Sequence, residues 1–556
     1  MSYVLIKNGY IYDGLGNPPF VGSLLLEDEN IKEIFIGKEV YKLKNLENTS
    51  IIDAEGYIIT PGFIDIHRHC DIQPFYGTEF GTTLLSQGIT TVVAGNCGFS
   101  MVPIPLDEEL SKEIYDFSEP VLGKPFREIK TISDYFSKLG NINLPVNFAT
   151  MIGCGTIKSS IKGFSNTPFN SEEIKKAVSY IEQAVEMGVV GVSAGIMYIP
   201  ECYNFKEDYI RMLQPLKKHN IPWCVHIRGE GNSLVSSITE VIDIAEKVRC
   251  PVEISHFKSC GKNNWNREIF KAIDCIELAR KNGIEVACDF YPYTGGSTSL
   301  VTMIPPQLIK GDIKKILNSF ETGEGIQNFR DSLKYTYADW DNYALSLGWD
   351  RILITGVNHE KNIKYIGKTV ADSVINYNFS DAAEFVGYLL NDEEGKVSIV
   401  NMSMCQEDVD VVAKLPYSCV ISDAIYAETN MPHPRMYGAF PKIIREYVNE
   451  RKIYSLETAV KKMTSMPAER VGITGRGAIK VGYYADINIF KLDEFKDNAT
   501  YENPKQLATG LDKCFVNGKI AWSKNKVVND SCGKKYVKIN ILLVISIERK
   551  YDYEEK

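Results

Sequence analysis

The sequence predicts an α/β protein whose centre is a (β/α)8 barrel, and three observations support this prediction. The middle of the chain alternates short apolar runs with amphipathic helical patterns, which is typical of βα units around a parallel sheet. There are eight such runs, the number that closes a barrel. Both ends of the chain are instead rich in short strand-like segments, and we expect them to meet in one composite β-sandwich domain.

The expected domains follow one another along the chain. Residues 1–60 show aliphatic runs broken by Asp-Gly and Gly-Asn turns and supply the N-terminal part of the β domain. Residues 61–470 are predicted to form the barrel. Residues 471–535 again show short apolar runs broken by turns, as the first segment does, and are predicted to complete the β domain. The tail, residues 536–556, fits neither pattern; its stretch 539–547 is compatible with an extra edge strand, and we assign the tail no function.

The eight runs of the barrel can be placed by their C-terminal ends. They end near His67, Cys97, Gly153, Gly195, His226, His256, Tyr291 and Asp423. Helical patterns such as Ser171–Met187 and 237–247 lie between them. The connection between the last two runs is far too long for a simple crossover, so residues of about 295–417 must hold an inserted lid subdomain.

Composition argues against several classes of function. The 556 residues carry a formal net charge of −9 and show no basic stripe with interleaved aromatic residues, which argues against a nucleic-acid-binding protein. No apolar stretch approaches the roughly 20 residues that span a bilayer, and the start lacks the pattern of a signal peptide. The 13 cysteines form no close pair of the CxxC type, so we expect reduced, mostly buried cysteines and a cytoplasmic location.

Five of the eight expected strands end on residues that can bind a metal. Ile66-His67-Arg68-His69 places two imidazoles on one face of a strand end, since side chains two apart point the same way. Cys97, His226, His256 and Asp423 end four later strands. The C-terminal ends of barrel strands converge on one mouth, so these side chains should meet. The alternative for each histidine is a buried, hydrogen-bonded core residue, but four of the chain's 7 histidines at strand ends favour a metal site.

Eight segments of the chain also match a known family. They are residues 61–69, 88–98, 191–198, 226–231, 254–258, 289–298, 433–435 and 475–479. On these motifs the chain resembles the amidohydrolase superfamily and, within it, the N-acyl-D-amino-acid deacylase (D-aminoacylase) family, in register from about residue 3 to residue 535. The most specific motif is Gly95-Asn96-Cys97-Gly98, because most amidohydrolases place a carboxylated lysine or a carboxylate where this family uses a cysteine.

The resemblance implies a zinc enzyme. The implied ligands of one tightly bound zinc ion are Cys97, His226 and His256. Those of a second, weaker position, with Cys97 near both, are His67, His69 and Asp423. A Cys/His/His set with an open fourth position suits catalytic zinc, and a thiolate suits zinc better than magnesium or calcium.

The reaction implied by the resemblance is hydrolysis of the amide bond of N-acyl-D-amino acids, which gives a carboxylate and a free D-amino acid. Asp423 would be the general base that takes a proton from a metal-activated water and returns it to the leaving amine. The alternative for Asp423 is a structural role as the cap of the next helix.

The resemblance also implies contacts to the substrate. Lys258 would supply the cation for the substrate carboxylate, and Tyr198 and Tyr293 would be hydroxyl donors. The alternatives are a solvated surface lysine and tyrosines packed at the edge of the core. Some members of the family supply an arginine from the segment after the Gly-Ser-Thr motif, whereas residues 297–310 of this chain contain none. The acyl group, the side chain and the strictness of D-selectivity therefore stay open.

Two further segments have alternative roles. Arg228 and Glu230 follow His226 and would form a pair that orients the ligands. His433-Pro434-Arg435 comes shortly after Asp423 and either closes over the mouth or is simply a loop.

Two other functions compete with the deacylase prediction. A hydantoinase-like or dihydropyrimidinase-like cyclic amidase would share the fold but usually carries a carboxylated lysine at the end of the fourth strand, where this chain has Val192-Ser193-Ala194-Gly195. A non-catalytic scaffold with the same barrel would characteristically lose metal ligands, and this chain keeps all six candidates. We expect an enzyme for a small-molecule substrate, with neither a nucleic-acid nor a membrane partner.

Overall fold

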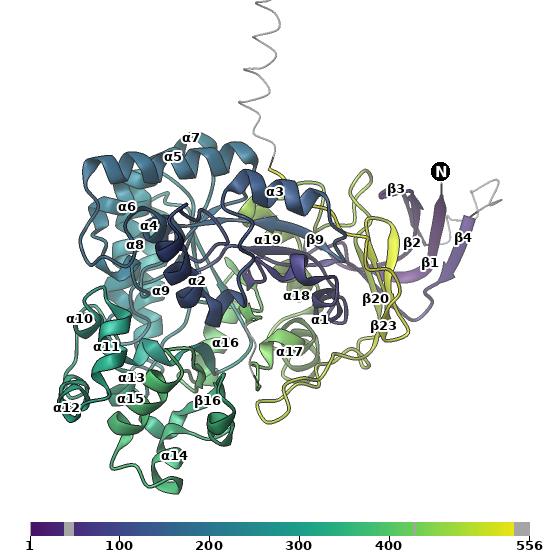
Figure 1. Cartoon of the computed structure of the whole chain (residues 1–556). Coiled ribbons are helices and arrows are strands. Elements are labelled where there is room, and N and C mark those ends of the chain that lie inside the picture. Colours follow the sequence, from purple (N-terminus) through teal and green to yellow (C-terminus); the bar gives the residue numbers. More distant parts are fainter. Residues whose placement is uncertain (1, 38–48, 427–429, 539–556) are drawn as a thin grey trace, which may run out of the picture.

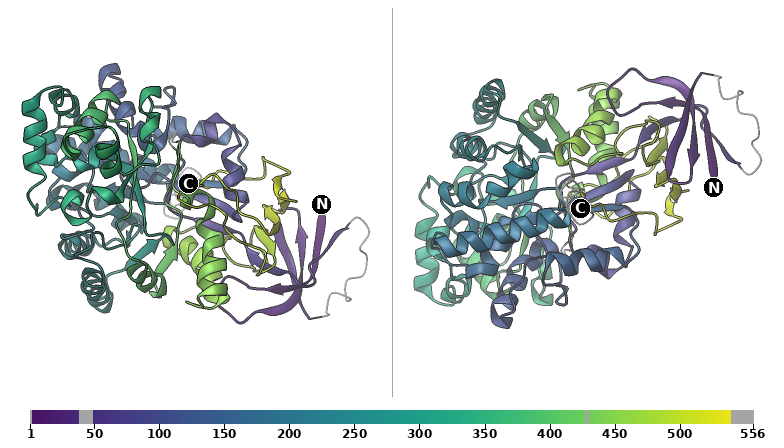
Figure 2. Two further views of the ribbon diagram at one scale, coloured as in Figure 1. Left: turned by 90° about the horizontal axis from the view of Figure 1, so that it is seen from below. Right: turned by 90° about the horizontal axis from the view of Figure 1, so that it is seen from above.

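The computed structural model describes residues 2–37, 49–426 and 430–538 (Figure 1). A barrel of parallel strands occupies the centre. A β-rich body made from both ends of the chain lies on one side of it, as both views of Figure 2 show. A mainly helical insertion, residues 296–401 and here called the inserted subdomain, lies at the other end of the molecule.

The barrel strands are β6 (Phe63–Asp65), β7 (Arg68–His69), β8 (Ile89–Ala94), β9 (Asn147–Thr150), β10 (Ile152–Gly153), β11 (Val192–Gly195), β12 (Trp223–His226), β13 (Val252–Ile254), β14 (Val286–Phe290), β18 (Ser418–Val420) and β19 (Ala424–Ile425). Parallel pairings run β6–β8–β9, then β10 to β14 and β18, then β19–β7. Because β6 leads into β7, β9 into β10 and β18 into β19, these pairings close a ring of eight segments. The predicted barrel is therefore present.

The helices around the barrel are α1 (Phe80–Leu85), α3 (Ile132–Gly140), α4 (Cys154–Lys162), α5 (Ser171–Met187), α6 (Lys206–Met212), α7 (Gln214–His219), α8 (Leu234–Val248), α9 (Glu268–Lys281), α16 (Gln406–Lys414), α17 (Arg435–Lys442), α18 (Leu456–Met463) and α19 (Ser465–Val471). Shorter turns are η2 (Gln73–Tyr76) and η3 (Glu201–Tyr203), and η7 (Ile443–Glu450) is π-helical. The helix predicted over 171–187 has those bounds because Asn170 and Glu173 form a capping box and Gly188 ends it with φ 95°.

The composite sheet contains β1 (Tyr3–Ile11), β2 (Phe20–Glu27), β3 (Asn30–Ile36), β4 (Thr49–Asp53), β5 (Ile58–Pro61), β20 (Ile487–Phe490), β21 (Leu511–Val516), β22 (Lys519–Ser523) and β23 (Lys526–Val527). Antiparallel pairing of β5 with β20 joins strands from the two ends of the chain into one nine-stranded sheet. Ile6 and Ile59 share one buried cluster with Ile487 and Phe515, so both ends contribute to the same core. The composite domain predicted from the two ends is thus a single continuous sheet.

The apolar run over residues 57–66 is divided between the two bodies, since β5 pairs in the composite sheet and β6 pairs in the barrel. The chain passes between them at Gly62, where a Cβ atom would lie 2.2 Å from the Thr90 Oγ1 atom. A residue with a side chain would therefore clash at this point, which is why a glycine stands there.

The inserted subdomain contains a three-stranded antiparallel sheet of β15 (Gly296–Ser299), β17 (Ser398–Asn401) and β16 (Ile352–Gly356). Its other elements are η4 (Leu300–Met303), α10 (Pro306–Ile309), α11 (Ile313–Ser319), α12 (Gly323–Ser332), α13 (Tyr343–Ser346), η5 (Trp349–Arg351), η6 (Glu360–Tyr365), α14 (Val370–Asn376) and α15 (Ala382–Asp392). Asp341 accepts hydrogen bonds from the backbone N–H groups of Glu230 and Gly231 at 2.6 and 2.7 Å, just beyond β12. These bonds hold the subdomain against the barrel mouth.

The C-terminal part of the described chain lies along the barrel. The backbone of residues 534–538 exchanges hydrogen bonds with Phe148 of β9 and with Gly188. The predicted edge strand over 539–547 lies outside the described residues. Within the described ranges, no helix is both long enough and apolar enough to cross a membrane.

Candidate metal centre and active site

The six expected metal ligands gather at the C-terminal mouth of the barrel, and all are buried. They come from the β6–β7 segment, from the residues just after β8 and β13, from the end of β12 and from the β18–β19 turn: His67, His69, Cys97, His226, His256 and Asp423. Their donor atoms form three overlapping groups, and within each group the atoms lie within 4.8 Å of one another. Side chains from five strands thus face one small volume.

The Cys97 thiol lies at the centre of the first group. Its Sγ atom is 3.2 Å from His67 Nε2 and 3.4 Å from His256 Nε2, and His226 completes a Cys/His/His set. In a tetrahedral zinc site with bonds of about 2.0–2.3 Å, neighbouring ligand atoms lie about 3.3–3.8 Å apart. The donor atoms and their spacing therefore fit zinc.

Asp423 forms another group with His67 and His256. Its Oδ1 atom lies 3.5 Å from His67 Nε2 and 3.4 Å from His69 Nε2. Cys97 also groups with these two histidines, so one thiol belongs to both sets. The arrangement fits two neighbouring cation positions that share Cys97.

Three of the ligands have an unusual backbone. Cys97, His256 and Asp423 have φ angles of 52°, 36° and 51°, in the left-handed region that residues with side chains rarely adopt. Each stands at the end of a strand, where this conformation turns the side chain away from the pleat and into the mouth. Such strain of order 1–3 kcal/mol per residue is typical of functional sites.

The protonation states suit metal binding. Burial lowers the pKa of His67 to about 4 and holds the pKa of His226 and of His256 well below the usual value. Neutral imidazole is the form that ligates metals. Burial and nearby Asp423 raise the pKa of the Cys97 thiol well above its usual value, so only a bound cation would favour the thiolate here.

Arg435 pairs with Asp423, a contact that the sequence did not predict. Arg435 Nη1 lies 2.7 Å from Asp423 Oδ2, and the guanidinium stacks 4.5 Å over the Tyr291 ring. Burial opposes ionisation of Asp423, but the guanidinium and the neighbouring histidines together outweigh it and hold the pKa of that carboxyl well below its usual range. The 433–435 segment, interpreted from sequence as a closing element or a loop, thus brings a buried arginine to the site at the start of α17.

Lys258 faces the site but is already paired. Its Nζ atom lies 2.5 Å from Glu230 Oε1 and 2.6 Å from His256 Nδ1. Burial alone would lower the pKa of Lys258, but Glu230 outweighs it and raises the pKa above the usual value. Lys258 is therefore a buried cation beside a ligand and not a solvated surface lysine.

The expected pair of Arg228 and Glu230 is not formed. Arg228 instead makes two hydrogen bonds of 2.9 Å to Glu240, whereas Glu230 Oε1 lies 3.1 Å from His256 Nδ1. Glu230 therefore contacts the expected ligand His256, with Lys258 and not Arg228 as its partner, and a role in orienting His256 stays a prediction. Sequence spacing could not show which of two nearby cations Glu230 meets.

The tyrosines differ in their positions. Tyr198 lines the cavity beside the ligands, with its ring 4.7 Å from that of His226. Tyr293 lines neither of the two cavities next to these side chains; its ring packs against His433 and Tyr501. Tyr291 lines the cavity instead, between Lys258 and Arg435. Tyr291 and Tyr293 are two residues apart, so alternation along a strand could not have distinguished them.

Two buried carboxylates that sequence reasoning missed support the ligands. Asp289 accepts a hydrogen bond from the backbone N–H of His256, and its Oδ2 atom lies 3.7 Å from His67 Nδ1. Glu201 accepts a hydrogen bond of 2.9 Å from the Gly195 N–H and another of 2.9 Å from the Tyr209 hydroxyl. Burial raises the pKa of Glu201 to about 7.

Two adjoining cavities surround the ligands. The inner one has a volume of about 50 Å³ and is lined by five of the six expected ligands, all except His67, together with Lys258, Tyr291 and Arg435. The outer one has a volume of about 630 Å³ and lies between the barrel, α2 (Glu108–Leu122) and the inserted subdomain. Both are lined by Phe99, Val121, Met197, Tyr198 and Thr298, so the inner cavity continues into the outer one.

Known proteins resemble this chain along almost its whole length. A family model described as the amidohydrolase family matches residues 418–521. The D-aminoacylase of Alcaligenes xylosoxydans xylosoxydans is 27% identical over 538 residues, which are 96% of each chain. The N-acyl-D-glutamate deacylase of the same organism is 26% identical over 519 residues, covering 93% of this chain and 92% of that one.

A solved structure agrees with these relatives. The N-acyl-D-glutamate deacylase of Bordetella bronchiseptica, described in complex with zinc and a phosphonate inhibitor, is 25% identical to this chain with a TM-score of 0.78. The similarity covers 96% of this chain and 98% of that one. The fold, the gathered side chains and these relatives agree: the chain is similar to the amidohydrolases and, along almost its whole length, to the D-aminoacylases.

Proposed function

We propose that this protein is a zinc-dependent hydrolase that cleaves the amide bond of N-acyl-D-amino acids. One observation supports the proposal most strongly: the Cys/His/His set, the Asp423 carboxylate and two buried cations all line one cavity. The cations are Lys258 and Arg435. Relatives that match nearly the whole chain are a D-aminoacylase and an N-acyl-D-glutamate deacylase. Their printed activities support the same substrate class for this chain.

Zinc fits the donor set. Cys97, His226 and His256 would hold one ion tightly, and His67, His69 and Asp423 would line a weaker second position. When bound, zinc supplies Lewis-acid chemistry that polarises an amide carbonyl and acidifies water.

Asp423 is suited to move the proton. Its Oδ2 atom is held by Arg435, which leaves Oδ1 facing the ligands as the proton acceptor. In this proposal Oδ1 takes a proton from the attacking water and returns it to the amine nitrogen as the C–N bond breaks. A substrate carboxylate that shares Arg435 would reduce the charge stabilisation of Asp423 and so make it a stronger base.

Arg435 is the best-placed group for the substrate carboxylate. Residues 297–310 contain no arginine, yet Ser297 and Thr298 line a small cavity together with Arg435. Apart from the ion pair of Nη1 with Asp423, the buried Nε and Nη2 groups of the guanidinium have no hydrogen-bond acceptor in the described part of the chain. Lys258, Tyr198 and Tyr291 line the same inner cavity and would complete the contacts. Tyr293, one of the predicted donors, would act only through His433.

A cyclic amidase of the hydantoinase type fits less well. Such enzymes usually carry a carboxylated lysine at the end of the fourth strand, and here that strand ends at Gly195. A Cβ atom at position 195 would lie 2.1 Å from the Cys97 carbonyl oxygen, so no residue with a side chain fits there. Cys97 occupies the space that such a lysine would need.

The proposal is tested by hydrolysis of paired N-acetyl-D- and N-acetyl-L-amino acids by the zinc-loaded enzyme, with a hydantoin as control. We expect release of free amino acid from the D series alone. Cleavage of the hydantoin, or of the L series only, would contradict the proposal. We also infer a cytoplasmic location, because all 13 cysteines are free and most are buried, as in a reducing compartment.

A further inference from the structure

The outer cavity is larger than a simple N-acetyl amino acid requires. Its volume of about 630 Å³ is in the range of pockets that enclose drug-sized ligands, about 300–1,000 Å³. The inner cavity of about 50 Å³ already surrounds the position of the amide between the ligands and the cations. Even the largest amino-acid side chain would leave much of the outer cavity empty, whereas an acyl group has no such limit on its size.

One wall of the outer cavity is a row of aromatic rings that starts at the metal centre. The ring of Tyr198 is 5.4 Å from that of Phe99, Phe99 is 6.0 Å from Phe117, and Phe117 is 4.8 Å from Phe164. Tyr198 in turn stacks beside the ligand His226. The row therefore offers a continuous apolar surface from the reacting carbonyl outwards.

The facing wall is aliphatic and belongs to the inserted subdomain. It is lined by Val301, Ile304, Ile309, Ile313 and Leu317. A flexible apolar chain would lie between these residues and the aromatic row, and each buried methylene would leave water.

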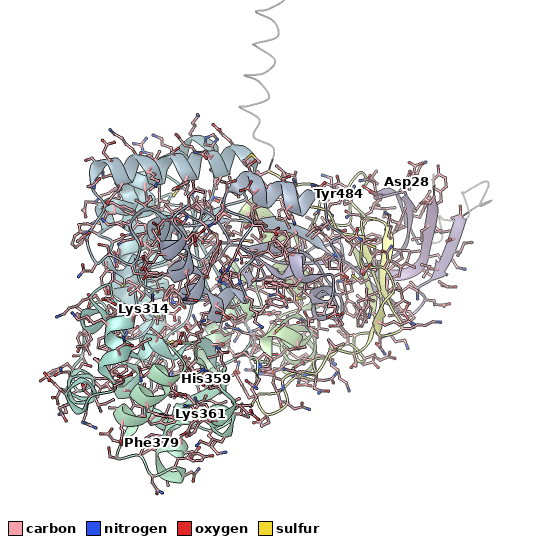
Figure 3. All side chains as sticks on the ribbon, viewed as in Figure 1. Asp28, Lys314, His359, Lys361, Phe379 and Tyr484 are labelled. Carbon is pink, nitrogen blue, oxygen red and sulfur yellow. The ribbon has the colours of Figure 1, made fainter. Side chains whose placement is uncertain are left out.

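The two lysines that line the outer cavity, Lys314 and Lys396, are already paired. Lys396 Nζ lies 3.5 Å from Asp116 Oδ1, and Lys314, labelled in Figure 3, lies 3.4 Å from Glu113 of α2. These pairs join the inserted subdomain to α2 across the cavity. Cations that are paired in this way do not offer a site for an acidic substituent, which favours an apolar occupant.

The direction of the amide decides which substituent enters the outer cavity. A secondary amide is trans, so the acyl chain and the amino-acid α-carbon lie on opposite sides of the C–N bond. With the substrate carboxylate at Arg435 and Lys258, the acyl chain points away from them and towards Met197 and Tyr198, where the outer cavity opens. We infer that the preferred substrates are N-acyl-D-amino acids with long apolar acyl groups of the fatty-acyl type, bound in the outer cavity. This inference rests on the proposed function.

The test is a series of N-acyl derivatives of one D-amino acid, from acetyl to dodecanoyl, compared by kcat/KM. We expect kcat/KM to rise by about fourfold for each added methylene until the cavity is filled, because that is the transfer free energy of one methylene. Octanoyl should exceed acetyl by at least about a hundredfold, since six methylenes are added and part of this gain is lost to chain ordering.

Variants locate the acyl chain. Ile313→Trp fills the outer cavity and should remove most of the rise of kcat/KM with acyl-chain length. Asn318 is exposed at the rim, so Asn318→Trp should reduce this rise only for the longest acyl chains. Ile375→Trp is the matched control, because Ile375 is exposed on α14 and does not line the cavity. The control should keep the wild-type dependence on chain length.

Each outcome separates the two proposals. If N-acetyl-D-amino acids are cleaved at rates that are flat or fall with acyl length, the inference about the acyl chain is wrong and the proposed function stands. The same holds if Ile313→Trp instead weakens cleavage of substrates with bulky amino-acid side chains, since the cavity would then hold the side chain. If no D-substrate of any length is cleaved, the proposed function itself is wrong.

Discussion

Replacing Glu201 with glutamine should remove part of the loss of folding stability that occurs as the pH rises through 7. Glu201 is 2% exposed and connects the end of β11 to η3 through its hydrogen bond from Gly195. A Cβ atom on Gly98, the residue after Cys97, would lie 1.9 Å from Glu201 Oε1, so this carboxyl fills the space behind the metal-binding turn. Glutamine has the same shape, so it can accept the hydrogen bond from the Gly195 N–H and fill the same space beside Gly98.

The magnitude follows from the pKa of Glu201. Burial raises this pKa from 4.5 to about 7, against hydrogen bonds from Gly195 and Tyr209 that lower it. The folded protein therefore keeps a proton that the unfolded chain loses, and the resulting stability is present below pH 4.5 and is lost as the pH rises through 7. Between pH 5 and pH 8 the loss amounts to about 2.5 kcal/mol.

The assay is urea unfolding of the zinc-loaded wild type and of Glu201→Gln at pH 5 and pH 8. Other titrating groups affect both proteins alike, so the difference between the two pH-dependent changes isolates Glu201. We expect the variant to gain about 2.5 kcal/mol relative to the wild type on going from pH 5 to pH 8. A relative change of less than about 0.5 kcal/mol, within the error of such comparisons, would refute the assigned pKa shift.

Three further predictions concern the centre itself. Cys97→Ser should lose most of the zinc at equilibrium dialysis, because a serine hydroxyl is a poor zinc ligand, and a chelator should then lower its Tm far less than that of the wild type. Asp423→Asn should retain zinc at the Cys/His/His set yet lower kcat by about 10²–10⁴-fold, and near-normal turnover in that variant would rule out Asp423 as the general base. Arg435→Met should lower kcat/KM by an amount equivalent to about 2–5 kcal/mol. Arg435→Lys should recover only part of this loss, because lysine lacks the planar guanidinium that binds a carboxylate through two N–H groups. Equal kcat/KM for the methionine variant and the wild type would contradict carboxylate binding by Arg435.

The barrel and its ligand positions were predictable because both depend on periodicity. Apolar runs with helical patterns between them indicated the eight strands, and the parallel direction alone requires their C-terminal ends to meet. His67, His226 and Asp423 could therefore be expected to converge although they lie far apart in the sequence. Their roles in binding and proton transfer stay predictions until the variants are measured.

Other features depend on the distances between side chains on different loops, which cannot be read from the apolar periodicity of the sequence. Nothing in the sequence distinguishes Arg228 from Lys258 as the partner of Glu230, because both lie within reach of it and only the path of the loops decides. The contact of Arg435 with Asp423 is set in the same way, by where α17 begins after the β18–β19 turn. The exact point at which the 57–66 run changes sheet, at Gly62, depends on the close approach of Thr90, which a continuous apolar pattern does not reveal.

The composite sheet has a consequence for how the chain is synthesised. Strands β1 to β5 emerge first from the ribosome, but β20, the partner of β5, is made near the end. Asn30 and Gly482, which are hydrogen-bonded, are 452 residues apart. At a synthesis rate of about 5–20 residues per second, the first strands wait roughly 20–90 s with one edge unpaired. During that time the apolar side of β5 is open to other nascent chains. Production of this protein should therefore depend more on chaperone supply during translation than the stability of the finished barrel would suggest.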